Sequence, residues 1–219
     1  MSLRIEAVPL GPFETNAYLL TADGSKDCAV VDAPKGAGEN LLAEIRARGL
    51  RVTHLLLTHG HWDHMCDAAD FRAAGAQVVA HRDDQRLIEQ VETVRPRYQA
   101  MIPWLEDRDF KSCKVDRWVD DGDTVELLGR TFEVRHVPGH CPGSILFHCA
   151  ADKVCFPGDA IFHGSVGRTD LPGGDWPTLL KSIRTRIYTL PDDTHLLPGH
   201  GDGTTVGEEK RANPYAKPA

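Results

Sequence analysis

The chain has 219 residues, of which 41% are hydrophobic, and a formal net charge of −7. This length allows one sizeable hydrophobic core and is short for two, so we expect a single domain over residues 1–219. The acidic balance and the lack of a basic run argue against a nucleic-acid partner. No stretch is apolar over the length that spans a bilayer, which argues against a membrane partner.

The N-terminus and the cysteines indicate the cellular compartment. The first twenty residues contain Glu6, Pro9, Pro12 and Glu14, which interrupt the apolar stretch that a secretory signal needs. Six cysteines occur without a C-x-x-C pair, and this favours free thiols in a reducing compartment over a disulfide framework or a thiolate zinc site. We therefore expect a cytoplasmic protein.

The first half of the chain mixes strand and helix patterns. Alternation of apolar and polar residues over 3–8, 16–22 and 28–33 predicts three strands with an antiparallel start. Further expected elements are a helix over 38–49, a buried strand over 52–58, a helix over 68–75, a strand over 77–81 and a helix over 83–94. Residues 95–120, which contain two prolines, predict a less regular connection.

The second half again gives strands and then a helix. Expected strands cover 123–129, 130–137, 144–150, 153–159 and about 194–200, and a helix covers 176–187. Because the strands come in two batches, each followed by helices, we predict an α/β fold with two facing sheets and the helices outside.

The densest group of polar side chains directly follows the buried strand over 52–58. It has the pattern H-x-H-x-D-H, formed by His59, His61, Asp63 and His64. His59 and His61 are two residues apart, so in an extended or loop backbone both imidazoles project the same way and can bind one ion. Asp63 and His64 present a second pair as the chain turns into a helix. Without a cation such a cluster would crowd competing donors and acceptors together, so we predict a metal site.

Three more ligand candidates follow apolar strands through glycine-containing turns. They are His140 in VPGHCPGS, Asp159 in CFPGDAIF and His200 in LLPGHGDG. Glycine at such a turn ends the strand abruptly and lets the backbone approach an ion. Together with the loop residues they provide five histidines and two aspartates, enough for two divalent cations with one carboxylate between them.

The signature at residues 59–64 resembles that of the metallo-β-lactamase superfamily, and the resemblance covers nearly the whole chain. The segments GSVGRTDLPGGD (164–175) and PGHGDGTTVGEEKRANPY (198–215) are similar to the hydroxyacylglutathione-hydrolase-like, or glyoxalase II-like, branch of that family. The resemblance implies an αββα four-layer sandwich and a metallohydrolase. It also implies a short form, since the chain ends at Ala219 without the C-terminal helical domain of full-length glyoxalase II enzymes.

The resemblance further implies how the ligands are shared. One metal would be held by His59, His61 and His140, a second by Asp63, His64 and His200, and Asp159 would bridge the two. Asp63 and Asp159 are the expected catalytic residues. Zinc is the expected metal, with iron and manganese as alternatives.

Two neighbouring cations predict a hydrolytic mechanism. A bound cation lowers the pKa of water from 15.7 to about 7, so a metal-bridging hydroxide is available near neutral pH. We expect it to attack a small thioester such as S-lactoylglutathione, because a thiol with a pKa of about 8.5 leaves as thiolate without a strong acid. Arg168, in VGRTD, lies where glutathione-thioester hydrolases of this type carry a basic residue, and it is the expected substrate-binding residue.

Two other activities remain open. A persulfide dioxygenase shares this scaffold and the G-R-T-D loop, and works with a single iron for which His59, His140 and Asp159 are available. A lactonase or esterase would use the same hydroxide on an ester. The metal, the acyl group and the oligomeric state are not fixed by these motifs.

Two positions depart from the family pattern. Cys141 stands where relatives commonly have threonine, and Met65-Cys66 replaces small residues. We interpret both thiols as small buried side chains. Among the other histidines, His54 is a candidate for supporting a ligand from behind.

Overall fold

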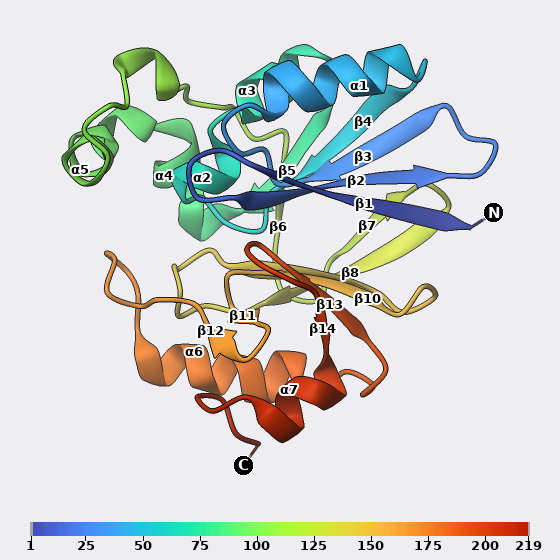
Figure 1. The fold of residues 1–219 in the computed structure, drawn as a ribbon, viewed down its shortest axis with the longest axis vertical. Coiled ribbons are helices and arrows are strands. Elements are labelled where there is room, and N and C mark those ends of the chain that lie inside the picture. The colour runs from blue at the N-terminus through green and yellow to red at the C-terminus, as the bar shows by residue number, and fades with distance from the viewer. Residues whose placement is uncertain (1, 219) are drawn as a thin grey trace.

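The computed structural model describes residues 2–218 and contains two six-stranded sheets packed face to face (Figure 1). The first sheet contains β1 (Leu3–Leu10), β2 (Thr15–Ala22), β3 (Asp27–Val31), β4 (Arg51–Leu56), β5 (Gln77–His81) and β6 (Arg117–Val119), in that spatial order. Strands β1 to β3 are antiparallel and β3 to β6 are parallel, so the expected antiparallel start is confirmed.

The second sheet has the spatial order β14-β13-β10-β9-β8-β7. Its strands are β7 (Thr124–Leu127), β8 (Arg130–His136), β9 (Ile145–Cys149), β10 (Val154–Gly158), β13 (His195–Pro198) and β14 (Thr204–Thr205). Only β10 and β13 run parallel within this sheet. A separate short hairpin consists of β11 (Ile161–Phe162) and β12 (Ser165–Val166).

Helices cover the outer face of each sheet, which gives the predicted αββα sandwich (Figure 1). On the first sheet these are η1 (Ala37–Leu41), α1 (Leu42–Ala47) and α3 (Ala68–Ala73); on the second they are α6 (Trp176–Ser182), η5 (Ile183–Ile187) and α7 (Val206–Ala212). The remaining turns and helices are α2 (Trp62–Met65), η2 (Arg82–Asp84), α4 (Gln85–Glu89), η3 (Val91–Thr93), α5 (Arg95–Met101) and η4 (Asp107–Asp109). Of the helices in residues 2–218, none is long and apolar enough to cross a bilayer.

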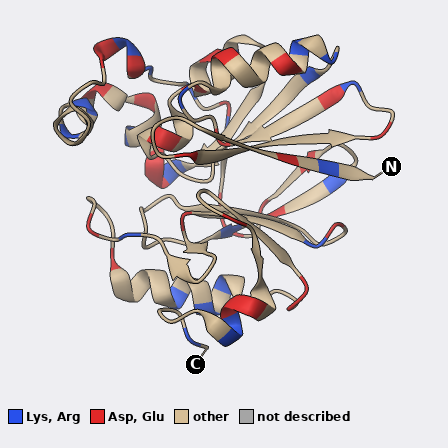
Figure 2. Ribbon diagram, viewed as in Figure 1, with Lys and Arg blue, Asp and Glu red and all other residues tan. Residues whose placement is uncertain are grey.

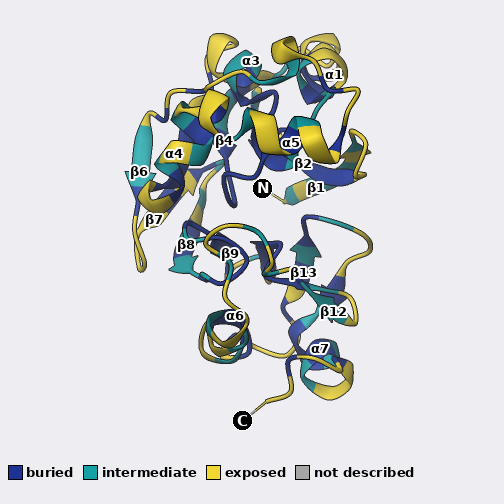
Figure 3. Cartoon of the chain, turned by 90° about the vertical axis from the view of Figure 1, so that its left-hand side faces the viewer, coloured by how far each residue is buried: buried dark blue, intermediate teal, exposed yellow. Residues whose placement is uncertain are grey.

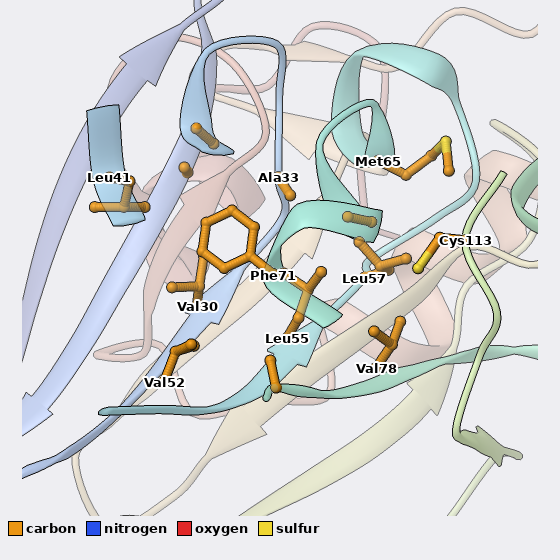
Figure 4. Close-up of a cluster of buried hydrophobic side chains, with 14 of the residues drawn as sticks. Val30, Ala33, Leu41, Val52, Leu55, Leu57, Met65, Phe71, Val78 and Cys113 are labelled. Atoms are coloured by element: carbon orange, nitrogen blue, oxygen red, sulfur yellow. The ribbon is translucent and has the colours of Figure 1, made fainter. Parts of the chain in front are cut away.

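Three apolar layers hold the sandwich together, and the strands between the helical layers are the most buried part (Figure 3). On the helix-covered face of the first sheet, Phe71 of α3 packs among Val30, Leu55 and other apolar side chains (Figure 4). Between the sheets, the rings of Tyr18 and Phe156 lie 5.2 Å apart. Charged residues of both signs occur on both helical layers (Figure 2). Because interiors of this kind pack densely, the strand ends are held in fixed positions.

The structure corrects several predicted elements. The connection over 95–120 was expected to be irregular, but it contains α5 and the sheet strand β6. Pro96 is compatible with α5 because it lies in the first turn, where its missing N–H has no partner in the helix. The helix expected over 83–94 is broken into η2, α4 and η3, and the elements β14 and α7 after His200 were not predicted.

Candidate metal centre

The seven predicted ligand residues lie together at one end of the sandwich, where strands of both sheets end. His59, His61, Asp63 and His64 lie in the loop after β4 and in the helix α2 that follows it. His140, Asp159 and His200 follow β8, β10 and β13. Three overlapping groups have ligand atoms within 4.8 Å of one another: His59, His61 and His140; His59, His64 and Asp159; and Asp63, His64 and His200. Residues far apart in sequence are therefore brought together as expected.

The first triad, His59, His61 and His140, consists of three buried imidazoles. Their exposed fractions are 2%, 6% and 2%. The Nδ1 atom of His61 lies 2.8 Å from Nε2 of His140, and Nε2 of His59 has no hydrogen-bond partner among the described residues although it is buried. A buried nitrogen without a partner is costly, and a bound cation would satisfy it.

The second triad, Asp63, His64 and His200, contains a carboxylate and lies nearer the solvent. Nε2 of His200 lies 3.3 Å from Oδ2 of Asp63 and 3.3 Å from Nε2 of His64. The side chains of Asp63 and His200 are 16% and 26% exposed, whereas His64 is fully buried. This set offers two nitrogens and one negatively charged oxygen to a cation.

Asp159 lies between the two triads. Its Oδ1 is 3.3 Å from Nε2 of His64, and its Oδ2 is 3.4 Å from Nε2 of His200 and 3.6 Å from Nε2 of His140. Gly199 permits this approach, because a Cβ there would lie 2.2 Å from Oδ1 of Asp159 and 2.5 Å from the His64 ring. Glycine at this strand end therefore allows the backbone to approach the centre closely, as expected.

Four of the five histidines are oriented by a hydrogen bond on the ring nitrogen that faces away from the centre. These contacts join His59 to Thr58 Oγ1 (3.1 Å), His64 to Asp32 (2.8 Å), His140 to the carbonyl of Arg168 (2.8 Å) and His200 to the carbonyl of Phe13 (3.0 Å). A carbonyl or carboxylate on one ring nitrogen fixes a proton there, so that in the neutral ring the other nitrogen presents its lone pair to the centre.

Asp32, at the end of β3, was missed by the sequence analysis. It is 1% exposed and accepts hydrogen bonds from the backbone N–H and hydroxyl of Thr58, both at 2.8 Å, and from His64. Its φ of 58° is a left-handed conformation that costs about 1 kcal/mol for a residue with a Cβ. The available signal was a lone acidic residue at the end of an apolar strand. His54, by contrast, lines another cleft with Asp27 and Glu126, so its expected supporting role is wrong.

Burial and charge shift the pKa values of the metal-free centre in opposite directions. Burial and the neighbouring His140 lower the pKa of His61 to about 3. Burial also acts on His200, but hydrogen bonds to Asp159 and Asp63 outweigh it and raise its pKa to about 10. For Asp63, burial is outweighed by His64 and by the hydrogen bond from His200, and the pKa falls to about 2. Burial therefore favours a neutral ring at His61, and the two carboxylates favour ion pairs at His200.

A cavity of about 410 Å³ opens onto the centre. Its apolar lining comes from Phe13, Tyr98, Met101, Phe162, Val166 and Leu171, and its polar lining from five of the seven ligand-type residues and Arg168. The Arg168 side chain is 52% exposed and donates hydrogen bonds of 2.6 and 2.7 Å to Asp170. The predicted substrate-binding residue thus lies at the cavity, already paired with a carboxylate.

The two unusual cysteines are buried. Cys141 is completely buried and donates a hydrogen bond from its thiol to Asp84 at 3.0 Å. Cys66 is 3% exposed, and burial raises the pKa of both thiols. All six cysteines are free.

The fold and the cluster of ligand-type residues together define a metallohydrolase of known type. Residues 10–200 match the profile of the metallo-beta-lactamase superfamily, and the chain belongs to that family. It is 37% identical over 221 residues, covering 97% of this chain and 98% of the relative, to the hydroxyacylglutathione hydrolase GloC of Haemophilus influenzae.

Solved structures show the same fold. The B3 metallo-beta-lactamase BLEG-1 superposes with a TM-score of 0.85 at 33% identity, covering 97% of this chain and 99% of its own. TTHA1623 in a di-iron-bound form gives a TM-score of 0.81 at 35% identity, covering 96% and 99%. ETHE1 from Myxococcus xanthus gives 0.78 at 25% identity, covering 97% and 84%.

Proposed function

We propose that this chain hydrolyses a small thioester of the S-lactoylglutathione type in a metal-dependent reaction. The observation that carries this proposal is the pair of triads meeting at Asp159, because one carboxylate between two donor sets is suited to two neighbouring divalent cations. The likeness to a hydroxyacylglutathione hydrolase supports a glutathione thioester as the substrate class.

The residues present fit a pair of cations. In this proposal the first triad would hold one ion and the second triad the other, with Asp159 as a shared ligand. The partnerless Nε2 of His59 supports this, since a buried ring nitrogen needs an electrophile or a donor. Imidazole-rich sites suit zinc; iron and manganese are alternatives, and the di-iron-bound neighbour supports iron. When bound, two such ions supply hydroxide at neutral pH and positive charge for the oxyanion.

The chain's own residues position the reactants. Asp159 and Asp63 are the proposed catalytic carboxylates. The hydroxyl of Thr15 donates to Asp63 at 3.2 Å, and together with His200 it holds that carboxylate at the cavity, where it can orient a water molecule. The apolar walls keep bulk water away from the reacting carbonyl, which strengthens every charge interaction inside. Arg168 binds a carboxylate of the substrate in exchange for Asp170.

The proposal is tested by elemental analysis combined with a thioester assay. Protein prepared metal-free and reloaded with zinc, iron or manganese should bind about two ions per chain and release lactate from S-lactoylglutathione with at least one of them. The free thiol is quantified at the same time. A chain that holds two ions but leaves a panel of glutathione thioesters intact would contradict the thioester assignment.

A persulfide dioxygenase is the second candidate. Among the proposed iron ligands His59, His140 and Asp159, Nε2 of His140 lies 3.6 Å from Oδ2 of Asp159, and His59 shares one candidate group with His140 and another with Asp159. The likeness to ETHE1 is compatible with this activity. Oxygen uptake with glutathione persulfide by protein holding one iron would support it, because a hydrolase consumes no oxygen. A lactonase or esterase is tested by measuring hydrolysis of lactone and ester substrates by the metal-loaded protein.

We also propose a cytoplasmic location and a small-molecule substrate as the only partner class. The six free cysteines support a reducing compartment. The net charge of −7 supports the absence of a nucleic-acid partner. Cell fractionation with an antibody to the chain tests the location.

A further inference from the structure

Asp84 lies directly behind the first triad, at the end of the turn η2 that follows β5. It is 1% exposed and is not among the candidate ligands. Its carboxylate accepts three hydrogen bonds: from the N–H of Gly60 at 2.7 Å, from the N–H of Gly143 at 2.8 Å and from the thiol of Cys141 at 3.0 Å. A buried carboxylate with three donors is a strong and specific connection.

The three donors belong to the two segments that carry the first triad. Gly60 lies between His59 and His61, and Cys141 directly follows His140. The first segment extends from the first sheet and the second segment joins two strands of the second sheet. One carboxylate thus ties together the parts of the two sheets that must come close for these imidazoles to share an ion.

Two glycines allow this tight arrangement. A Cβ at Gly143 would lie 2.5 Å from Cγ of Asp84, and a Cβ at Gly60 would lie 3.0 Å from Cβ of Asp84 and 2.7 Å from that of Leu87. Any larger residue would force the carboxylate away from the backbone N–H groups. Both segments are therefore built to receive Asp84.

We propose that Asp84 is a positioning residue for the first triad, which sets the separation of His140 from His59 and His61. The inference rests on the proposed function only in treating the triad as a metal site. Asp32 has the corresponding place for the second triad, where it contacts the ring of His64 directly. Asp84 instead acts through two backbone donors and one thiol donor.

The test measures zinc affinity in two parent variants that each keep one triad. His200→Ala leaves only the first triad complete, and His140→Ala leaves only the second. Asp84→Asn retains the side-chain size but replaces one acceptor oxygen with an amide that cannot accept from a backbone N–H. We expect zinc affinity to fall about 10- to 100-fold in the His200→Ala parent and to stay within about twofold in the His140→Ala parent.

Asp83→Asn is the matched control, because Asp83 is adjacent to Asp84, its side chain is 55% exposed, and its ion-pair contact is with His81 at 3.8 Å. Cys141→Ala and Cys141→Ser are a second pair of variants with a smaller expected loss of stability. Only the alanine variant loses the donor to Asp84. We expect weaker zinc binding for alanine and near-parent binding for serine. This pair also decides the matter if Asp84→Asn does not fold.

Hydrogen exchange in the metal-free chain gives a readout that needs no ion. The amides of Gly60 and Gly143 should exchange faster in Asp84→Asn than in Asp83→Asn, with other core amides unchanged. Equal losses of zinc affinity in both parents, or no loss in either, would overturn the role of Asp84 and leave the proposed function standing. If the parents take up neither zinc, iron nor manganese, the metal site of the proposed function fails, and unchanged exchange at the two glycines would then overturn this inference separately.

Discussion

The two triads of the metal centre share Asp159 but are built differently. The first consists of three imidazoles that are almost fully buried, and its two chain segments are tied from behind by Asp84. The second contains a carboxylate, and His200 is 26% exposed at the cavity. A neutral, enclosed donor set and a charged, accessible one thus lie side by side.

This difference teaches how one centre can bind an ion firmly and still present a reactive face. Neutral rings held by a packed framework need little reorganisation to accept a cation. The second triad keeps its charge beside the cavity, where a substrate enters and where Asp63 can orient water. Substitutions that act on both triads, on one triad or on neither should therefore have effects of decreasing size.

The largest effect is expected from Asp159→Ala, because this carboxylate lies 3.3 to 3.6 Å from members of both triads. Loss of the shared carboxylate should lower kcat/KM for the thioester by about 10³-fold or more and reduce the bound metal to below two ions per chain. Kinetics and elemental analysis of the same preparation measure both, and circular dichroism checks folding. Retention of two ions with near-normal turnover would show that Asp159 does not join the triads.

A smaller effect, stronger on the second triad than on the first, is expected from Asp32→Asn, because Asp32 contacts the ring of His64 directly and that of His59 only through Thr58. The carboxylate fixes the ring of His64, so its loss should weaken zinc binding in the second triad by about 10- to 100-fold. The variant is made in the His140→Ala parent, where only the second triad is complete, and zinc is titrated by competition with a chelator. Asp27→Asn serves as a control on the same strand, since Asp27 pairs with Arg51 far from the centre. An equal loss in the His200→Ala parent would remove the distinction between the triads.

The comparison also explains what the sequence could and could not predict. The cluster of seven ligand-type residues was predictable because four of them occur in H-x-H-x-D-H and the other three follow glycine turns at strand ends. The αββα layers followed from two batches of strands. These signals are local, so a single chain segment reveals each one.

The supporting residues carry no such local signal. Asp32 and Asp84 belong to no recognisable motif, and their partners lie 24 to 59 positions away in sequence. Their roles appear only when Thr58, Gly143 and the imidazoles are brought against them by the packing of the sheets. Helix α5 was missed for a related reason: the proline that suggested a break lies in its first turn, where it does no harm.

The pH dependence of metal loading should differ between the triads by about tenfold per pH unit. In the metal-free chain the pKa of His200 is raised to about 10, so below that pH the ring carries a proton that must leave when a cation binds. The pKa of His61 is lowered to about 3, so this ring is already neutral at higher pH. Between about pH 6 and 8, zinc affinity should rise at least about tenfold per unit in the second triad, where the pKa of His64 is also raised, and much less in the first.

This prediction is measured in the same two parent variants, with proton release followed by an indicator dye in weakly buffered solution. The His140→Ala parent should release a proton from His200 on binding zinc. Equal slopes of affinity against pH in the two parents would contradict the assignment of a neutral and a charged triad.

The smallest effect is expected outside both triads, at Arg168. Its carbonyl supports His140, but its guanidinium only pairs with Asp170 at the cavity, so Arg168→Ala should leave the metal content unchanged. Loss of an exposed charge-assisted contact to the substrate should raise KM for S-lactoylglutathione about fivefold, with kcat within about twofold. Because Asp170 competes for the guanidinium, Asp170→Asn should lower KM instead. If both variants raise KM to the same extent, the pair shapes the loop and Arg168 does not bind substrate.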